Sequence, residues 1–292
     1  MRFPRLLIVS AFAATSCFSA GAGREPDLKR LYFPVGLALD ASHSRLFVAS
    51  SDFDLQFSGG SILALDLPRI RGLVPRECRV DADCDSGQAC DTSDVSGAQA
   101  SWWCLPKGKS ACELWGARSI GEQLDYPGRC EGVELTAPQD GGSSLVTSAV
   151  RTSAFATELL YLSRPGGERS EGRLYAPMRG DSTLHWVEVD ADGKLDCGEG
   201  DGGGCDDAHR VHARAETNNQ VKLEMPVEPF AIAATPSGDA LVVTHQTTNR
   251  VSLFTQDWSS SKGPRLSAIE EMAAAGPMGL GALPATQGVP DG

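Results

Sequence analysis

Apolar residues occur along this chain in short runs separated by turns rich in glycine, proline and aspartate, and three stretches share one pattern. "FPVGLALDASHSRLFVAS" begins at Phe33, "EPFAIAATPSGDALVVTH" at Glu228 and "GPMGLGALP" at Gly276. Each places a proline just before a triplet of small, large and small residues. In the first two, a polar turn and a second apolar run follow, and then a third run, "GSILALDL" or "NRVSLF". The pattern predicts short strands joined by tight turns.

A fourth copy lacks this opening but keeps the later runs, "GRLYAP" from Gly172 and "STLHWVEVD" from Ser182. Strand and turn units that recur every ~45 to 65 residues are typical of β-propeller blades. Small residues suit the innermost strands, which crowd around the axis, while larger residues fill the space between blades. A β-sandwich is the alternative, since it shares the turn spacing but not the period of the whole unit.

The segment "VVTHQTTNRVSLF" resembles the YVTN-type repeat of seven-bladed propellers in bacterial and archaeal surface proteins, and "LFVASSDFDLQFSGGSILALD" is a looser copy. We therefore expect an all-β fold, a β-propeller of about four to five blades with a small disulfide-rich inserted module. A blade that opens at Pro277 has little chain left before Gly292. We hypothesise that the chain is a truncated or shortened version of a longer propeller.

A segment of different composition, residues 72–132, separates a first propeller part at 31–71 from the remaining blades at 133–292. It is rich in Asp, Gly and Ser and poor in residues that build a core, so disulfides are expected to hold it together. A zinc site is the alternative, although none of the gaps is the CxxC of zinc knuckles. The pairing stays open among Cys78, Cys84, Cys90, Cys104, Cys112 and Cys130.

The N-terminus reads as a signal peptide over residues 1–16, with Arg2 and Arg5 before the apolar run Leu6 to Ala14. The following "ATSC" resembles the lipobox of bacterial lipoproteins, although Ala14 stands where that class usually has Leu. The resemblance implies that Cys17 is acylated and that residues 17–30 form a lipidated tether. An ordinary signal peptide cleaved farther along is the alternative.

The cysteine count agrees with lipidation. The chain has nine cysteines. Setting Cys17 aside leaves eight that can pair as disulfides, the six of the inserted segment together with Cys197 and Cys205. Phe18, rather than Asp, follows the anchor cysteine. By resemblance to lipoproteins, this indicates an exported protein held at the outer membrane through its N-terminal lipid.

The segment "EVDADGKLDCGE" matches a calcium-binding EF-hand loop at several positions. The flanking pattern is that of strands, however, so a hairpin turn with Gly193 in a left-handed conformation is the alternative. Apart from this candidate calcium site, we expect no cofactor. Its candidate ligands are Glu188, Asp190, Asp192, Asp196 and Glu199.

Cys197 and Cys205 are followed by His209 and His212, which would complete a zinc site of two cysteines and two histidines. The glycine-rich "GEGDGGG" between the two cysteines favours a small loop closed by a disulfide instead.

The composition is acidic, with 38 Asp and Glu against 26 Lys and Arg, which argues against nucleic-acid binding. The chain has no GxxxxGK, GxSxG or HExxH pattern. We therefore expect no catalytic residues and a binding or scaffolding module at the cell envelope, with a protein or glycan as its ligand. The alternatives are a propeller enzyme of the lactonase or quinoprotein type, with a metal or cofactor in its channel, and a non-functional fragment.

Overall fold

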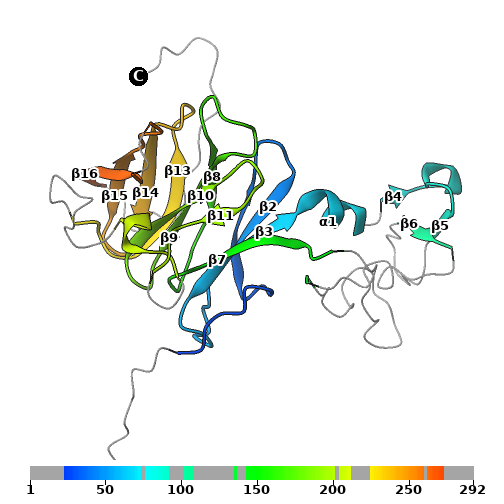
Figure 1. The fold of residues 1–292 in the computed structure, drawn as a ribbon, viewed down its shortest axis with the longest axis horizontal. Coiled ribbons are helices and arrows are strands. Elements are labelled where there is room, and N and C mark those ends of the chain that lie inside the picture. The colour runs from blue at the N-terminus through cyan, green and yellow to red at the C-terminus, as the bar shows by residue number, and fades with distance from the viewer. Residues whose placement is uncertain are drawn as a thin grey trace, which may run out of the picture.

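The computed structural model describes residues 23–73, 76–91, 102–107, 135–136, 143–200, 204–211, 224–259 and 262–272. In this part of the chain, three antiparallel sheets lie side by side (Figure 1). We number them as blades in chain order. Blade 1 contains β1 (Pro34–Leu39), β2 (Arg45–Ser50), β3 (Gly60–Asp66) and β7 (Val146–Thr152), in that order.

Blade 2 contains β8 (Leu160–Ser163), β9 (Gly172–Met178), β10 (Thr183–Val189) and β11 (Leu195–Asp196), and a short β12 (Arg210–Val211) also pairs with β10. Blade 3 contains β13 (Pro229–Ala234), β14 (Ala240–His245), β15 (Arg250–Thr255) and β16 (Arg265–Glu271). Each blade is an up-and-down meander of neighbouring strands, which is the blade of a β-propeller. The all-β, propeller-type fold expected from the sequence is thus confirmed. The stretch from Gly276 and the question of a truncated last blade lie outside the described residues.

The two proline-led repeats fold alike. In both β1 and β13 the register with the next strand shifts just after the proline, between Pro34 and Gly36 and between Pro229 and Ile232. The residue before each proline has a positive φ, 47° at Phe33 and 54° at Glu228. A bulge at the entry of a strand bends it and increases its twist, so the shared sequence pattern encodes the same bend in both blades.

The small residues of the inner strands allow close packing between blades. A Cβ atom added to Gly36 of β1 would lie 2.7 Å from the backbone nitrogen of Leu159, at the entry of blade 2. One hydrophobic cluster, which includes Phe47, Ile62 and Leu174, fills the space between blades 1 and 2. A second, which includes Trp186, Leu241 and Phe254, fills the space between blades 2 and 3.

The cysteine-rich segment is inserted within blade 1. β3 runs into helix α1 (Leu67–Leu73), and the chain returns to pair β7 with β3. The first blade is therefore completed by a strand that follows the insertion. Beyond α1 lies a separate small sheet of β4 (Glu77–Cys78), β6 (Trp102–Pro106) and β5 (Gln88–Asp91), far from blade 3 (Figure 1).

Two disulfides hold this small sheet, Cys78–Cys90 and Cys84–Cys104. They confirm the expectation of a disulfide-linked insertion for these four cysteines, and the sulfur atoms are therefore not available as zinc ligands. Cys17, Cys112 and Cys130 lie outside the described residues, as does the signal peptide. Among the residues that the structure describes, no helix is long and apolar enough to cross a membrane.

Candidate functional site

A cavity of about 680 Å³ lies between blades 1 and 2, where β3 and β10 begin and β7 ends. Its wall combines the end of the β2–β3 loop at Ser58 and Gly59, the end of β7 with Ser153, and His185 on β10. The N-terminal segment closes one side with Glu25 and Pro26, and the loop before β12 closes another. The remaining lining residues are Arg151, Thr152, Glu199, Gly200, Gly204, Cys205, Asp206, Asp207 and Arg210.

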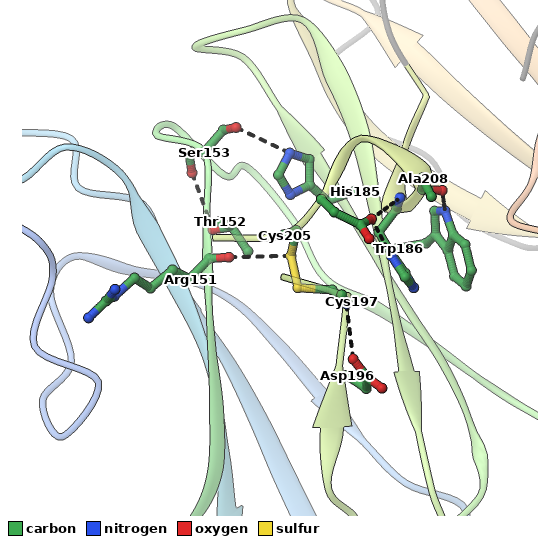
Figure 2. The surroundings of a disulfide bond; sticks show 12 residues. Arg151, Thr152, Ser153, His185, Trp186, Asp196, Cys197, Cys205 and Ala208 are labelled. Atoms are coloured by element: carbon green, nitrogen blue, oxygen red, sulfur yellow. Dashed lines mark hydrogen bonds and ion pairs between the residues drawn. A yellow bond between two sulfur atoms is a disulfide. The ribbon is translucent and has the colours of Figure 1, made fainter. Parts of the chain in front are cut away.

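Three polar side chains meet at this cavity: Ser153 and His185 line it, and Asp181 contacts both of them. The Oγ of Ser153 lies 3.2 Å from Nε2 of His185 and also donates a hydrogen bond to Oδ2 of Asp181 (Figure 2 shows the Ser153–His185 contact). Nε2 of His185 lies 3.8 Å from the same carboxylate oxygen. His185 is 1% exposed and packed within blade 2, so its ring is held in place. A hydroxyl, an imidazole and a carboxylate therefore form one hydrogen-bonded group.

The carboxylate of Asp181 remains charged at neutral pH. Burial raises its pKa, but hydrogen bonds from His185, Ser153 and Thr183 and the charge of His185 outweigh this effect and lower it to about 2. Thr183 Oγ1 donates to the other oxygen, Oδ1, at 2.6 Å. Asp181 can therefore stabilise a positive charge that forms on His185.

Two arginines face acidic partners around the cavity. Arg151 Nη2 lies 2.7 Å from Oε2 of Glu25, and Arg210 forms an ion pair with Asp207. Arg210 Nη1 also lies 4.0 Å from Oδ2 of Asp181. The lining holds four carboxylates, Glu25, Glu199, Asp206 and Asp207, against these two guanidinium groups, so it is negative overall.

The disulfide Cys197–Cys205 fixes the loop that supplies the outer wall. Both residues are buried, and Sγ of Cys205 lies 3.3 Å from the carbonyl oxygen of Arg151 on β7 (Figure 2). Inside the loop, Gly200 donates a backbone hydrogen bond to Gly204 at 2.8 Å. The expected disulfide-closed loop is confirmed, so these sulfurs are not zinc ligands either.

Of the two histidines proposed as zinc ligands after this loop, the structure describes only His209. His209 Nδ1 lies 2.7 Å from Oδ1 of Asp206, and its ring packs 4.3 Å from that of Trp186. His212 lies outside the described residues.

The five candidate calcium ligands lie along the hairpin between β10 and β11 and just beyond it. Glu188 binds the guanidinium groups of Arg164 and Arg173. Oδ1 of Asp190 accepts hydrogen bonds from the backbone of Asp192 and Lys194, and Gly193 has a φ of 76°. Asp196 accepts a bond from the backbone of Gly198, while Glu199 lines the cavity.

The backbone between β10 and β11 forms a hairpin turn, which was the alternative to a calcium-binding loop. Within the described residues, no three of these five carboxylates come within ligand distance of one another. The calcium site itself remains a prediction.

No linear spacing in the sequence indicates the serine, histidine and aspartate cluster. Ser153 follows β7, Asp181 precedes β10 and His185 lies on it, and the cluster forms only when blades 1 and 2 pack together. The sequence held one clue to the cluster, the polar His185 within the apolar run "STLHWVEV". The structure shows that this histidine is buried.

Comparisons with known proteins find β-propellers that resemble this chain at low sequence identity. No protein-family model matches it, and no curated protein matches it. Among solved structures, a candidate 6-phosphogluconolactonase from Bacteroides uniformis is 12% identical with a TM-score of 0.40, over 83% of this chain and 45% of that one.

The periplasmic gluconolactonase of Pseudomonas aeruginosa is 13% identical with a TM-score of 0.32, over 83% of this chain and 58% of that one. The β-propeller domain of Cps50 (Swd1) from Myceliophteria thermophila is 14% identical with a TM-score of 0.30, over 86% and 59%. These neighbours are propeller-like proteins. The chain spans about half the length of the structures it matches.

The comparisons correct one expectation from the sequence. Lactonase-type propellers are prominent among the similar structures, which favours the alternative of a propeller enzyme over a non-catalytic binding or scaffolding module. At these identities the similarity concerns the fold, so the chemistry has to be argued from the chain's own residues. The sequence could not indicate the Ser153, His185 and Asp181 cluster because it joins residues from different strands.

Proposed function

We propose that this chain forms part of a propeller hydrolase of the lactonase type, which opens a lactone or related ester in the cavity between blades 1 and 2. The observation that carries the proposal is the hydrogen-bonded group of Ser153, His185 and Asp181, of which Ser153 and His185 line the cavity. A hydroxyl within hydrogen-bond reach of an imidazole, with a carboxylate beside it, is the arrangement of an activated nucleophile and its base.

In the proposed reaction, the Ser153 hydroxyl turns its proton from Asp181 to Nε2 of His185, and His185 accepts this proton as Oγ attacks the carbonyl carbon. The ring oxygen of the lactone leaves and takes this proton from His185, which gives a ring-opened acyl ester on Ser153. A water molecule, deprotonated by His185, then hydrolyses the ester and restores the hydroxyl. Asp181 stabilises the imidazolium at each stage, and Arg210, 4.0 Å from Asp181, is the nearby cation that can face the developing oxyanion.

Rates of ring opening test this proposal, measured on the full chain with a panel of sugar and aliphatic lactones. His185→Gln and Ser153→Ala should each lower kcat by at least about 100-fold, because they remove the base and the nucleophile. His43→Gln is the matched control, since His43 is exposed in the turn between β1 and β2. Equal activity of wild type and His185→Gln would exclude the proposed site.

We also propose that the protein is a YVTN-type propeller lipoprotein, exported and held at the outer membrane by acylated Cys17. The disulfides Cys78–Cys90, Cys84–Cys104 and Cys197–Cys205 support export, because such bonds persist in oxidising compartments. Intact-mass analysis of the membrane fraction, with and without reductant, tests this. It should show an acylated chain that begins at Cys17, and a chain still carrying residues 1–16 would exclude lipidation.

A further inference from the structure

Four cysteines of the inserted module lie together at one place in the small sheet. Cys90 of β5 stands directly opposite Cys104 of β6, and each is bonded to a cysteine of another segment, Cys90 to Cys78 and Cys104 to Cys84. The Sγ atom of Cys84 lies within 4.8 Å of the Sγ atoms of both Cys78 and Cys90. We call these four residues the sulfur centre. Its two disulfides are therefore in each other's immediate neighbourhood.

One residue holds the two disulfides in this position. Asp81 begins a short 3-10 helix (Asp81–Asp83), and its backbone carbonyl accepts a hydrogen bond from the amide of Cys84 at 3.1 Å. The carboxylate oxygen Oδ1 of Asp81 accepts a second bond, from the amide of Cys90 at 2.8 Å. The turn that carries Cys84 is thus tied to the strand that carries Cys90.

Each disulfide joins a buried cysteine to a half-buried one. Cys78 and Cys104 are 5% and 2% exposed, whereas Cys84 and Cys90 are half-buried. A cavity of about 410 Å³ lies beside Cys78. Structural disulfides of secreted proteins resist reduction, while exposed disulfides are the labile or catalytic ones. The partial exposure of Cys84 and Cys90 therefore places the sulfur centre within reach of a reagent in solvent.

The arrangement permits one disulfide to be reduced through the other. Thiol–disulfide exchange proceeds by attack of a thiolate on a disulfide sulfur. One thiolate of an external dithiol attacks Sγ of Cys84, which breaks the bond to Cys104 and leaves Cys104 as a thiolate that takes up a proton. The second thiol of the reagent then closes the reagent's own disulfide and releases Cys84 as a thiolate. The dithiol has now given two electrons to the protein.

The released thiolate of Cys84 lies beside the second disulfide. It attacks Sγ of Cys90, forms a Cys84–Cys90 bond and displaces Cys78 as a thiolate, which takes up a proton. This step breaks one disulfide and forms one, so it needs no further reductant. The two electrons then reside on the thiols of Cys78 and Cys104, the two buried members of the sulfur centre.

We propose that the sulfur centre is a thiol–disulfide exchange site that takes two electrons from an external dithiol at Cys84 and passes them to Cys78. Glu77, Asp83 and Arg79 line the cavity beside Cys78, so its wall carries two carboxylates and one guanidinium group. This excess of negative charge favours a neutral dithiol over an anionic one. The site is separate from the proposed hydrolase, and failure of either proposal leaves the other unaffected.

Differential alkylation of the full chain tests the exchange. The protein is treated with an equimolar amount of dithiothreitol, a neutral dithiol, blocked with N-ethylmaleimide and mapped by peptide mass spectrometry without further reduction. We expect molecules that are labelled at both Cys78 and Cys104 and carry a Cys84–Cys90 disulfide. Labels confined to the native pairs, Cys78 with Cys90 or Cys84 with Cys104, would overturn the proposal.

Cys104→Ser tests the same transfer without a reductant, since it leaves Cys84 as a free thiol beside the Cys78–Cys90 disulfide. N-ethylmaleimide should label Cys78 as well as Cys84 in this variant, and a label on Cys84 alone would contradict the exchange. Cys205→Ser is the matched control. In the part of the chain that the structure describes, only the sulfur centre brings three cysteine sulfurs together, so the label in this control should stay on Cys197.

Asp81 provides a readout of positioning. Asp81→Ala should slow the transfer from Cys84 to Cys78 about threefold to tenfold and leave the first reaction at Cys84 unchanged, because Cys84 and Cys90 are no longer held together. Asp81→Asn should restore the transfer, since its amide oxygen can still accept the bond from Cys90. Equal transfer rates in wild type and both variants would exclude this role of Asp81.

A pair of dithiols of similar size tests the substrate class. Neutral dimercaptopropanol should reduce the sulfur centre faster than anionic dimercaptopropanesulfonate, and added salt should narrow the difference because it screens the charges of the cavity wall. A faster reaction with the anionic reagent would show that the assigned class is wrong.

Discussion

Individual buried side chains link the blades in addition to the apolar clusters. Arg173 of β9 is fully buried, and its Nη2 lies 2.7 Å from Oε1 of Glu188. Its guanidinium lies 4.9 Å from the ring centre of Trp186 and 5.0 Å from that of Trp258. Trp258 lies between β15 and β16 of blade 3. One cation thus satisfies a carboxylate within blade 2 and joins blade 2 to blade 3.

Replacing Arg173 should therefore be costly. Arg173→Ala leaves Glu188 with one partner fewer and removes both ring contacts, which should lower the free energy of unfolding by about 3–5 kcal/mol. Arg164→Ala removes the half-exposed partner of the same carboxylate and should cost at most about 1 kcal/mol. Urea unfolding followed by tryptophan fluorescence measures both. Equal losses would show that burial of Arg173 adds nothing.

His245 makes stability depend on pH. Its Nε2 lies 2.8 Å from Oγ of Ser252 and its Nδ1 lies 3.1 Å from the carbonyl of Val227, and burial lowers its pKa from 6.5 to about 4. The unfolded chain therefore binds a proton more readily than the folded chain between these values. The stability from neutral His245 is present above pH 6.5 and is lost as the pH falls towards 4.

His245→Asn should flatten this pH dependence, since asparagine does not titrate. Between pH 6.5 and 4, wild type should lose on the order of 3 kcal/mol more unfolding free energy than the variant. Denaturant titrations at several pH values test this, and parallel curves for the two proteins would contradict it.

At the scale of elements, close approach between inner strands decides how blades pack. The backbone at Leu159 and Glu158 leaves no room for a side chain at Gly36. Glu158 reaches the next blade as well, where Oε2 accepts a hydrogen bond from the backbone of Ile232 at 2.7 Å. The entry of blade 2 is therefore wedged between the inner strands of blades 1 and 3.

Gly36→Ala should force these strands apart and lower the unfolding free energy by about 1–3 kcal/mol. Gly72→Ala is the control, because it lies in α1 with open space around its Cα and should stabilise the helix slightly. Thermal unfolding distinguishes the two. A Gly36→Ala protein as stable as wild type would show that the inner strands can separate freely.

The Cys197–Cys205 disulfide closes the loop that forms one side of the cavity. Replacing both cysteines by serine should lower the unfolding free energy by about 2–3 kcal/mol, because the loop regains freedom in the unfolded chain. It should also lower kcat/KM, since Glu199, Asp206 and Asp207 lose their fixed positions. Full activity in the double variant would show that the loop is not part of the site.

At the scale of the whole molecule, the repeat pattern predicted the propeller because Pro34 and Pro229 open strands of the same shape. Blade 2 was harder to delimit, since its entry at Glu158 and Leu159 has no proline and no small triplet and relies on packing against Gly36. β7 could not be assigned to blade 1 because the insertion separates it from β3. The same long-range pairing brings Ser153 to His185, so the site was hidden for the same physical reason.

The most direct test of this account is covalent trapping at Ser153. The full chain is treated with diisopropyl fluorophosphate, which phosphorylates serines activated by a neighbouring base, and the adduct is located by peptide mass spectrometry. We expect one adduct, on Ser153, which His185→Gln abolishes and His43→Gln leaves intact. An unmodified Ser153, or labelling that persists without His185, would contradict the proposed active site.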